Sequence, residues 1–219
     1  MSPPRNAPNS ARRSEKSRRA ILGAALDLVE ESGYAKLSIE GIAARAGVGK
    51  QTIYRWWPSK GAVLLDALLA LSENQEGDVV ALPDTGDLEA DLKLVLRATV
   101  AQLNDPRYDQ PMRALSTEIL HDPELAAVYA ELLERPMMEM RQERLRGAQR
   151  AGELPAELDL ALAVDMIWGP LFNRWALRTG PLTPEYADVL VETALDGLRP
   201  RAVPATSSGP ASGIPGRDA

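Results

Sequence analysis

The chain has 219 residues, of which 45% are apolar and 26% charged, and it contains no cysteine. This composition supplies enough apolar side chains for a core, and it excludes a disulfide framework, a thiol nucleophile and a thiolate metal site. The formal net charge of −6 is unevenly distributed. Residues 1–60 carry 11 Lys and Arg against 5 Asp and Glu, a balance of +6. The remaining residues carry 14 bases and 26 acids, a balance of −12. We therefore predict a basic N-terminal lobe, able to attract phosphates, joined to an acidic body.

Residues 1–13 are predicted to form a disordered basic arm. They are rich in Pro, Asn, Ser and Arg and show no apolar periodicity. Arg5, Arg12 and Arg13 would either lie along a minor groove or only keep the chain soluble. A first helix is expected from about Ser14 to a stop at Gly33. Its apolar stripe consists of Ile21, Ala25, Leu28 and Val29.

The segment 38–57, SIEGIAARAGVGKQTIYRWW, predicts two short helices across a tight turn. Ser38 is a suitable N-cap for the first helix, and Gly47 can adopt the left-handed backbone that ends it. The apolar positions of the first helix are Ile39, Ile42, Ala43 and Ala46. In the second helix we expect Ile53, Trp56 and Trp57 to share a buried face, because they are spaced i, i+3, i+4.

The remaining side chains of the second helix are predicted to project outward. They are Lys50, Gln51, Thr52, Tyr54 and Arg55. These side chains suit the bases and phosphates of a major groove. They provide two cations, two hydroxyl groups and an amide that can make paired hydrogen bonds. An ordinary solvated helix face normally includes acids, and residues 49–57 contain none. The pattern therefore favours a helix-turn-helix that binds double-stranded DNA over a simple helical corner.

The run IAARAGVGKQTIYRWWPSKGAVLLDAL resembles the DNA-binding domain of TetR/AcrR-type transcriptional regulators, and the resemblance covers about residues 14–73. It implies that Tyr54 and Lys60 contact the phosphate backbone, that Gln51 and Thr52 lie nearest the bases, and that Trp57 fills the core of the domain. Two positions depart from the family pattern. Gly49 stands where the family usually has a capping Ser, and Trp57 replaces the usual Phe.

The rest of the chain is predicted to be helical, so the fold class is all-α, with a three-helix DNA-binding domain at 14–73 and a bundle for ligand binding and dimerisation at 74–198. A helix from Ser59 to about Ser72 would connect the two, with Lys60 in its first turn and an apolar stripe of Val63, Leu64, Ala67, Leu68 and Leu71. Residues 73–86 are read as a linker and residues 199–219 as a disordered tail. Further helices are expected at about 87–104, 109–120, 123–134, 136–151, 157–178 and 184–198.

The predicted helix at 157–178 is apolar around much of its circumference. One stripe is Leu160, Val164, Ile167, Leu171 and Trp175, and a second, interpreted as facing another subunit, is Ala161, Trp168 and Phe172. Pro170 is expected to kink this helix. The family resemblance implies that this helix and the helix at 184–198 form a homodimer interface, with Tyr186, Val189, Leu190, Thr193 and Leu195 on the second helix.

Methionines and aromatic residues of the body are candidates for a pocket that binds a small-molecule effector, because such side chains adapt to varied apolar ligands. The candidates are Met112, Leu115, Ile119, Met137, Met138, Met140, Trp168 and Phe172, with Arg174 and Asn173 as polar groups that could orient a ligand. Ordinary packing in the core is the alternative for each apolar residue.

Two other functions compete with regulation. Glu118 and His121 have the Glu-x-x-His spacing of di-iron bundles, but His121 is the only histidine, so only a single-metal enzyme site or a plain helix end is left. The other alternative is a helical adaptor whose DNA-binding lobe is vestigial. We expect instead a cytoplasmic, ligand-responsive, dimeric transcriptional regulator, a repressor rather than an enzyme, without a cofactor, a metal or a membrane partner.

Overall fold

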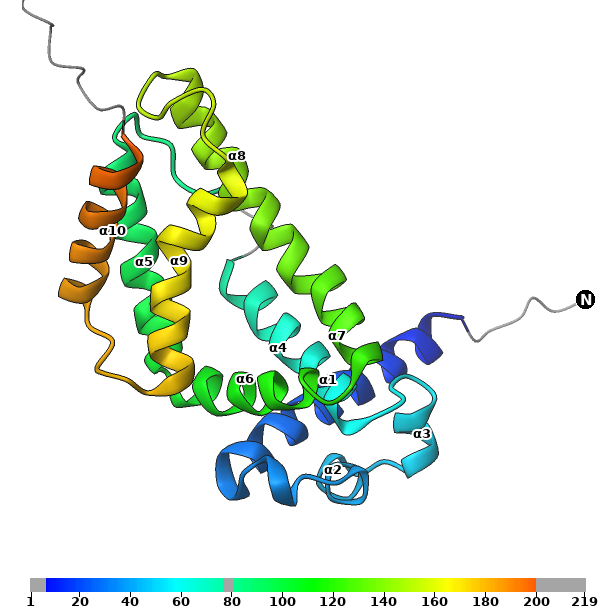
Figure 1. Ribbon diagram of the computed structural model, residues 1–219. Coiled ribbons are helices and arrows are strands. Elements are labelled where there is room, and N and C mark those ends of the chain that lie inside the picture. Colours follow the sequence, from blue (N-terminus) through cyan, green and yellow to red (C-terminus); the bar gives the residue numbers. More distant parts are fainter. Residues whose placement is uncertain (1–6, 77–80, 200–219) are drawn as a thin grey trace, which may run out of the picture.

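The computed structural model describes residues 7–76 and 81–199, and every regular element within them is helical. The first lobe consists of α1 (Ala7–Ser32), a 3-10 turn (Tyr34–Lys36), α2 (Ile39–Ala46), α3 (Lys50–Tyr54) and α4 (Lys60–Glu76). The second lobe consists of α5 (Leu88–Asn104), α6 (Pro106–Ile119), α7 (Pro123–Tyr129), a π-helical turn (Ala130–Glu134), α8 (Arg135–Arg150), α9 (Leu160–Leu177) and α10 (Pro184–Leu198). Figure 1 shows α5, α9 and α10 side by side, with α6 running beneath them toward α1 and α4. The all-α prediction is confirmed.

Several expected boundaries differ from the structure. Helix α1 begins at Ala7, so residues 7–13 of the expected disordered arm are helical, and Arg5 lies outside the described residues. Helix α4 continues to Glu76, into the segment read as a linker, and α6 begins at Pro106 rather than at 109. Proline has no N–H to satisfy at a first helical position, so Asp105-Pro106 starts a helix instead of delaying it. The expected tail at 200–219 lies outside the described residues.

Side-chain caps fix the starts of most helices in the second lobe. In these helices a side-chain oxygen of the N-cap residue accepts a hydrogen bond from a backbone N–H of the first turn. The caps are Asp87 for α5, Asp105 for α6, Asp122 for α7, Asp159 for α9 and Thr183 for α10. These contacts satisfy donors that a helix cannot pair internally. Proline follows the cap in α6, α7 and α10. The Asp-Pro and Thr-Pro pairs therefore mark helix starts; the start at Pro123 was expected from the sequence, whereas the start at Pro106 was not.

The second lobe contains a buried ion pair that also holds part of the connecting segment. Arg144 of α8 donates to Asp91 of α5 over 2.8 Å, and both side chains are almost fully buried. Asp91 also accepts from the backbone N and the hydroxyl of Thr85, and Arg144 Nε donates to the carbonyl of Pro83 over 2.7 Å. Residues 83–85 of the expected linker are therefore attached to the bundle.

Burial raises the pKa of Asp91, but the hydrogen bonds from Thr85 and Arg144 outweigh burial, so this pKa lies below the ordinary value of an aspartate. The ionised carboxylate is thus the form that the fold favours.

Helix α6 connects the two lobes, because it packs against both α1 and α4. None of the helices in the described part of the chain combines the length and the apolar character needed to cross a membrane.

Candidate nucleic-acid interface and internal pocket

Helices α2 and α3 form the expected helix-turn-helix. The Ser38 hydroxyl accepts from Gly41 N over 3.1 Å at the start of α2, and Gly47, with φ of 67°, ends α2 in the left-handed conformation. Ile42 and Ile53 are completely buried against the lobe's core. Gly49 provides no side-chain cap for α3, as its departure from the family's capping serine implies. The backbone of the turn and the two buried isoleucines therefore fix the orientation of α3.

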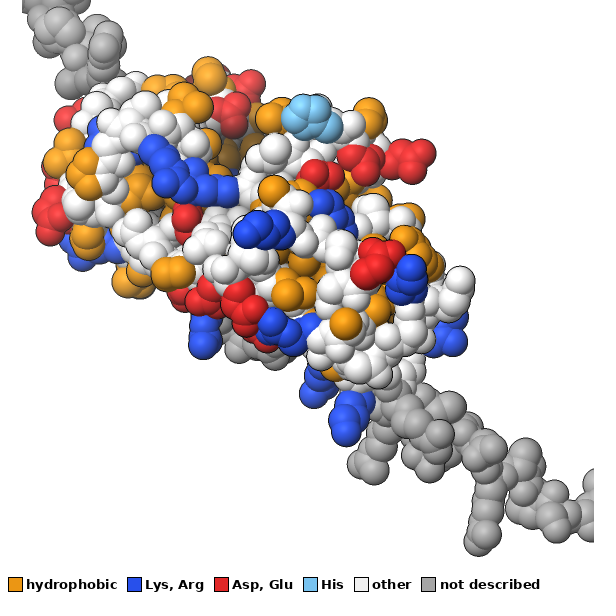
Figure 2. Space-filling view, turned by 90° about the horizontal axis from the view of Figure 1, so that it is seen from below, with side chains coloured by type: hydrophobic (Ala, Val, Ile, Leu, Met, Phe, Trp, Pro, Cys, Tyr) orange, Lys and Arg blue, Asp and Glu red, His pale blue; other side chains and the backbone are white. Residues whose placement is uncertain are grey.

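The outward face of α3 presents the side chains predicted to contact DNA. Lys50, Gln51, Tyr54 and Arg55 are exposed, whereas Thr52 is half-buried. Lys50 Nζ lies 2.9 Å from a carboxylate oxygen of Glu40 in α2, an ion pair that the pattern of α3 alone did not reveal. Figure 2, a view onto the end of the molecule that carries α2 and α3, shows Lys and Arg side chains spread over the surface with acidic side chains among them.

The two adjacent tryptophans after α3 have different environments, which corrects the expectation that both are buried. Trp57 is 6% exposed and Trp56 is 44% exposed, because α3 ends at Tyr54 and the following turn rotates Trp56 outward. Trp57 Nε1 donates to Asp66 of α4 over 3.0 Å, and Asp66 also accepts from Arg18 of α1. Trp57 therefore connects the end of α3 to both α1 and α4.

Lys60 lies at the start of α4, with its ammonium turned toward the 3-10 turn. Its Nζ lies 3.2 Å from the carbonyl oxygen of Leu37 and 3.4 Å from that of Tyr34, and 4.1 Å from the centre of the Tyr34 ring. An ammonium has three N–H donors, so two carbonyl contacts leave one for an external acceptor.

The second lobe contains a cavity of about 420 Å³ between α6, α8 and α9. Of the pocket residues predicted from the sequence, Met112, Met137, Met138, Trp168 and Phe172 line it. Tyr108, Ser116 and Tyr129 line it as well and were not predicted. The size and the largely apolar lining are those of a small-molecule site.

Arg141 of α8 is a buried, charged lining residue that the sequence did not reveal. Its side chain is 7% exposed, and its guanidinium carbon lies 5.0 Å from the Trp168 ring centre and 5.6 Å from that of Phe172. Its Nε is buried without a hydrogen-bond partner. In the sequence Arg141 is one of several charged residues in a stretch that reads as a solvated helix, so only the helix phase relative to Met137 and Met138 could have indicated it.

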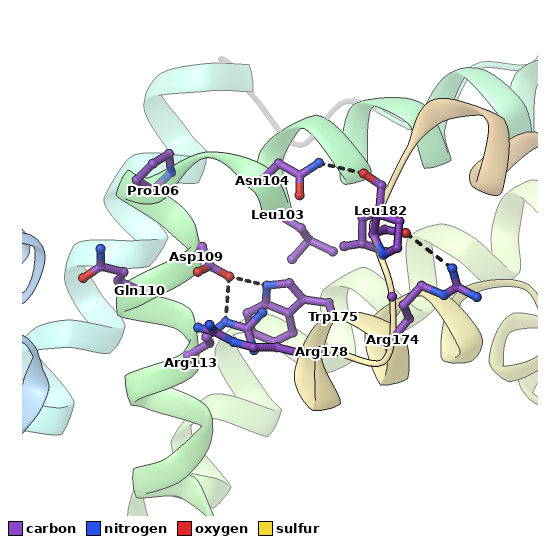
Figure 3. Close-up of a pocket in the computed structure, with 12 residues that line it drawn as sticks. Leu103, Asn104, Pro106, Asp109, Gln110, Arg113, Arg174, Trp175, Arg178 and Leu182 are labelled. Atoms are coloured by element: carbon purple, nitrogen blue, oxygen red, sulfur yellow. Dashed lines mark hydrogen bonds and ion pairs between the residues drawn. The ribbon is translucent and has the colours of Figure 1, made fainter.

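Five predicted pocket residues lie elsewhere. Leu115 is completely buried in the core, and neither Ile119 nor Met140 lines the cavity. Arg174 belongs to a second hollow of about 360 Å³ where α6 meets the end of α9 (Figure 3). There it stacks over the Tyr186 ring at 3.7 Å and donates to the Pro181 carbonyl, so it does not orient a molecule in the larger cavity. Asn173 lines neither the larger cavity nor this hollow.

The second hollow is a site of structural contacts. Asp109 accepts from Trp175 Nε1 over 2.6 Å and from Arg113 Nε over 2.8 Å, as Figure 3 shows. Arg113 also lies 4.3 Å from the Trp175 ring centre. These contacts hold α6 against the end of α9, and Trp175 lines both this hollow and the larger cavity.

Comparison with known proteins identifies the family. Residues 21–67 match the family described as bacterial regulatory proteins, tetR family, and residues 82–194, more than half of the chain, match the family described as tetracyclin repressor-like, C-terminal domain. The chain belongs to the TetR family. It is therefore a helix-turn-helix transcriptional regulator, as the resemblance implied.

Relatives of similar length agree with this assignment. An HTH-type transcriptional regulator of Bacillus subtilis (strain 168), YdeS, is 33% identical over 188 residues, which cover 85% of this chain and 92% of that protein. A DNA-binding transcriptional repressor, TetR, of Mycobacteroides abscessus is 30% identical over 84% of this chain and 94% of that protein. Among solved structures, the crystal structure of the TetR family transcription regulator SCO0332 matches with a TM-score of 0.67 and 33% sequence identity. The match covers 84% of this chain and 100% of the SCO0332 chain.

The outward face of α9 and α10 in this TetR-family chain carries large exposed apolar side chains. They are Leu162, Met166 and Leu177 of α9 and Val189 of α10. The stripe that was expected to face another subunit is corrected here. Trp168 is buried and Phe172 half-buried, and both face the cavity, so only Ala161 of that stripe is on the outside. The α9 segment is continuous through Pro170.

The Glu118 and His121 pair does not resemble a metal site of the kind considered from the sequence. His121 follows the end of α6 and is exposed, and its Nδ1 lies 2.8 Å from the carbonyl oxygen of Thr117. Among the residues that the structure describes, no three His, Cys, Asp or Glu side chains are grouped as metal ligands. His121 therefore belongs to a helix end, and Asp122 after it caps α7.

Proposed function

We propose that this TetR-family regulator is a cytoplasmic repressor, which binds a near-palindromic operator as a homodimer and is released by a small apolar or amphipathic effector in the 420 Å³ cavity. The observation that carries the proposal is the acid-free outward face of α3 on a lobe that α6 connects to this cavity. The printed name of the Mycobacteroides abscessus relative, a transcriptional repressor, supports the sign of regulation.

In this proposal α3 is the recognition helix. Gln51 and Thr52 are placed nearest the bases, because both lie in its first turns, where a helix entering a major groove reaches base edges. Tyr54 and Arg55 are assigned to phosphates. To reach DNA, Lys50 must break its ion pair with Glu40 or contact DNA and Glu40 at the same time. Lys60 is assigned to a phosphate, which it would contact through its remaining N–H donor.

Lys60→Ala is expected to reduce the slope of log affinity against log salt concentration by about 0.9 for each half-site, since one phosphate contact is lost from each. Affinity should fall for all DNA sequences alike. Filter-binding titrations at several salt concentrations measure this slope, and Arg146→Ala, an exposed cation of α8, serves as the control. An unchanged slope would mean that Lys60 serves only the carbonyls of Tyr34 and Leu37.

Gln51→Ala is expected to relax base preference at one position in each half-site by about 1–3 kcal/mol, because an amide that reads a base pair discriminates by roughly that amount. Competition binding with single-base operator variants measures the preference. Gln110→Ala, an exposed glutamine of α6, should leave it unchanged. Weaker binding with an unchanged base preference would mean that Gln51 contacts the phosphate backbone of the DNA instead of a base. If the wild-type protein binds no DNA, only the adaptor function is left.

The dimer is proposed to form through the exposed apolar face of α9 and α10 defined by Leu162, Met166, Leu177 and Val189. A two-fold dimer uses the same surface of both subunits, so one apolar face is sufficient. The symmetry would set two α3 helices at a spacing near one helical turn of DNA, about 34–36 Å, or a multiple of it.

Helix α6 is proposed to transmit the effector signal. It supplies Tyr108, Met112 and Ser116 to the cavity and packs against α1 and α4 of the DNA-binding lobe. Helix α7 adds a second contact, because Leu125 lies so close to Gly61 in the first turn of α4 that a Cβ on Gly61 would be 2.8 Å from it. An effector that binds the conformation released from DNA more tightly than the DNA-binding conformation shifts the equilibrium between the two. The shift is no larger than the difference between its affinities for these two conformations.

A further inference from the structure

Arg141 is a buried cation whose Nε has no hydrogen-bond partner in the described part of the chain, and its guanidinium contacts the rings of Trp168 and Phe172. The other arginine buried in α8 is paired, because Arg144 forms an ion pair with Asp91 over 2.8 Å and donates to the Pro83 carbonyl, although its Nη1 also lacks a hydrogen-bond partner. The two residues lie on the same helix, so their difference is not a property of α8 as a whole. It arises from the cavity, which Arg141 lines and Arg144 does not.

The surroundings of Arg141 disfavour its charge. Burial lowers its pKa from the ordinary value and outweighs the nearby charge of Glu134, which raises it, although an arginine in a protein stays protonated. Contact with the Trp168 and Phe172 rings compensates only part of the lost hydration, since a cation over a ring gains less than a cation that is paired and hydrogen-bonded. A buried charge of this kind is stabilised when an anion enters the cavity.

The other polar groups of the cavity are arranged differently. Glu134 and Asp165 line it but are exposed, so water screens their charges. Burial raises the pKa values of Tyr108 and Tyr129, so both phenols stay neutral and can donate hydrogen bonds. The buried part of the lining is therefore cationic and hydrogen-bond donating, whereas the acids are in contact with solvent.

We propose that the effector of this cavity carries a carboxylate that pairs with the guanidinium of Arg141, while its apolar body packs against Met112, Trp168 and Phe172. This inference rests on the proposed function, in which the cavity holds the effector. A planar guanidinium and a planar carboxylate form two parallel hydrogen bonds, a match that an ammonium lacks. A single arginine balances one negative charge, which favours a carboxylate over a doubly charged phosphate ester.

The test compares three probes that share one apolar body and differ in the head group: phenylbutyrate, the neutral phenylbutyramide and the cationic phenylbutylamine. Calorimetric titration of the full-length protein measures their affinities. The wild type is expected to bind the carboxylate at least tenfold more tightly than the amide, because a hydrogen bond to a charged group contributes more than a neutral one. The amine is expected to bind most weakly.

Two variants of Arg141 separate ligand recognition from a structural role. Arg141→Met should abolish the preference for the carboxylate over the amide, and Arg141→Lys should retain only part of it. Arg150→Met, an exposed arginine at the end of α8, is the control and should bind as the wild type does. Without a ligand, Arg141→Met is expected to unfold at the same or a higher temperature than the wild type, because it removes an unpaired buried charge.

Equal binding of carboxylate and amide by the wild type, a preference for the amine, or no binding of the carboxylate at millimolar concentration would overturn the inference. Gel-shift titrations with the same probes distinguish its failure from failure of the proposed function. If the amide or the amine releases operator DNA, the regulator function stands and only the carboxylate assignment fails. If the wild type binds no operator DNA at all, the proposed function itself fails.

Discussion

Asp91→Ala is expected to lower the free energy of unfolding by about 3–5 kcal/mol, because it removes the buried partner of Arg144 and leaves its guanidinium only the exposed carboxylate of Asp84, 3.4 Å away, as an ionic partner. The substitution also removes the hydrogen bonds that Asp91 accepts from Thr85, so residues 83–85 lose their attachment to α5. Urea denaturation followed by circular dichroism measures the loss.

Asp188→Ala is the matched control for this experiment. Asp188 accepts two hydrogen bonds from Arg97, at 2.7 and 2.6 Å, but the pair lies on the surface. Its removal should cost only a small fraction of the Asp91 effect, since water screens and solvates exposed ion pairs. If both variants lose the same free energy of unfolding, burial does not account for the stability that the Asp91 and Arg144 pair contributes.

The same pair predicts the direction of a pH dependence. The pKa of Asp91 is lowered in the folded state, so the stability that it contributes is fully present above the unfolded pKa of an aspartate, about 3.9, and is lost as the pH falls below that value. Asp91→Ala should therefore differ from the wild type less in acid than at neutral pH.

Trp57→Ala is expected to destabilise the DNA-binding lobe by about 3–5 kcal/mol and to abolish operator binding. The change creates a cavity at the junction of α1, α3 and α4, and it removes the hydrogen bond to Asp66. Trp57→Phe should lose only about 0.5–1.5 kcal/mol, the typical contribution of one hydrogen bond, and should still bind DNA. Denaturation and gel-shift titration of the same preparations measure both effects.

Trp56→Ala provides the control from the adjacent position. Trp56 is largely exposed and stacks on Trp57 at 5.9 Å between ring centres, so its loss should cost less than about 1.5 kcal/mol. If Trp56→Ala destabilises the protein as much as Trp57→Ala does, the assignment of Trp57 as the connection between α3 and the rest of the lobe is wrong.

Much of the fold could be predicted from local signals. The helix starts after Asp87, Asp122 and Thr183 and the stop at Gly47 follow from side-chain caps and backbone preferences, which act within a few residues. The two tryptophans show where such reasoning ends. Helical spacing places Trp56 with Ile53 only if α3 continues, and α3 ends at Tyr54.

The pocket was harder to predict than the fold. Apolar character indicated that Leu115 and Met112 face inward, but it could not decide which of them borders empty space, because this depends on how α6, α8 and α9 pack. Arg141 was missed for a related reason. The surrounding stretch contains the exposed acids Glu139 and Glu143, and Arg141 is buried against Trp168 and Phe172 of α9, which are distant in sequence.

Footprinting of the full-length protein on the DNA that flanks its own gene tests the central claim most directly. Two α3 helices related by two-fold symmetry should protect one near-palindromic segment, with half-site centres one helical turn apart or a whole multiple of it. Gln51→Ala should weaken this protection more than protection of unrelated DNA. Protection of a single asymmetric half-site by a monomer, or no protection beyond that of unrelated DNA at low salt, would contradict the account.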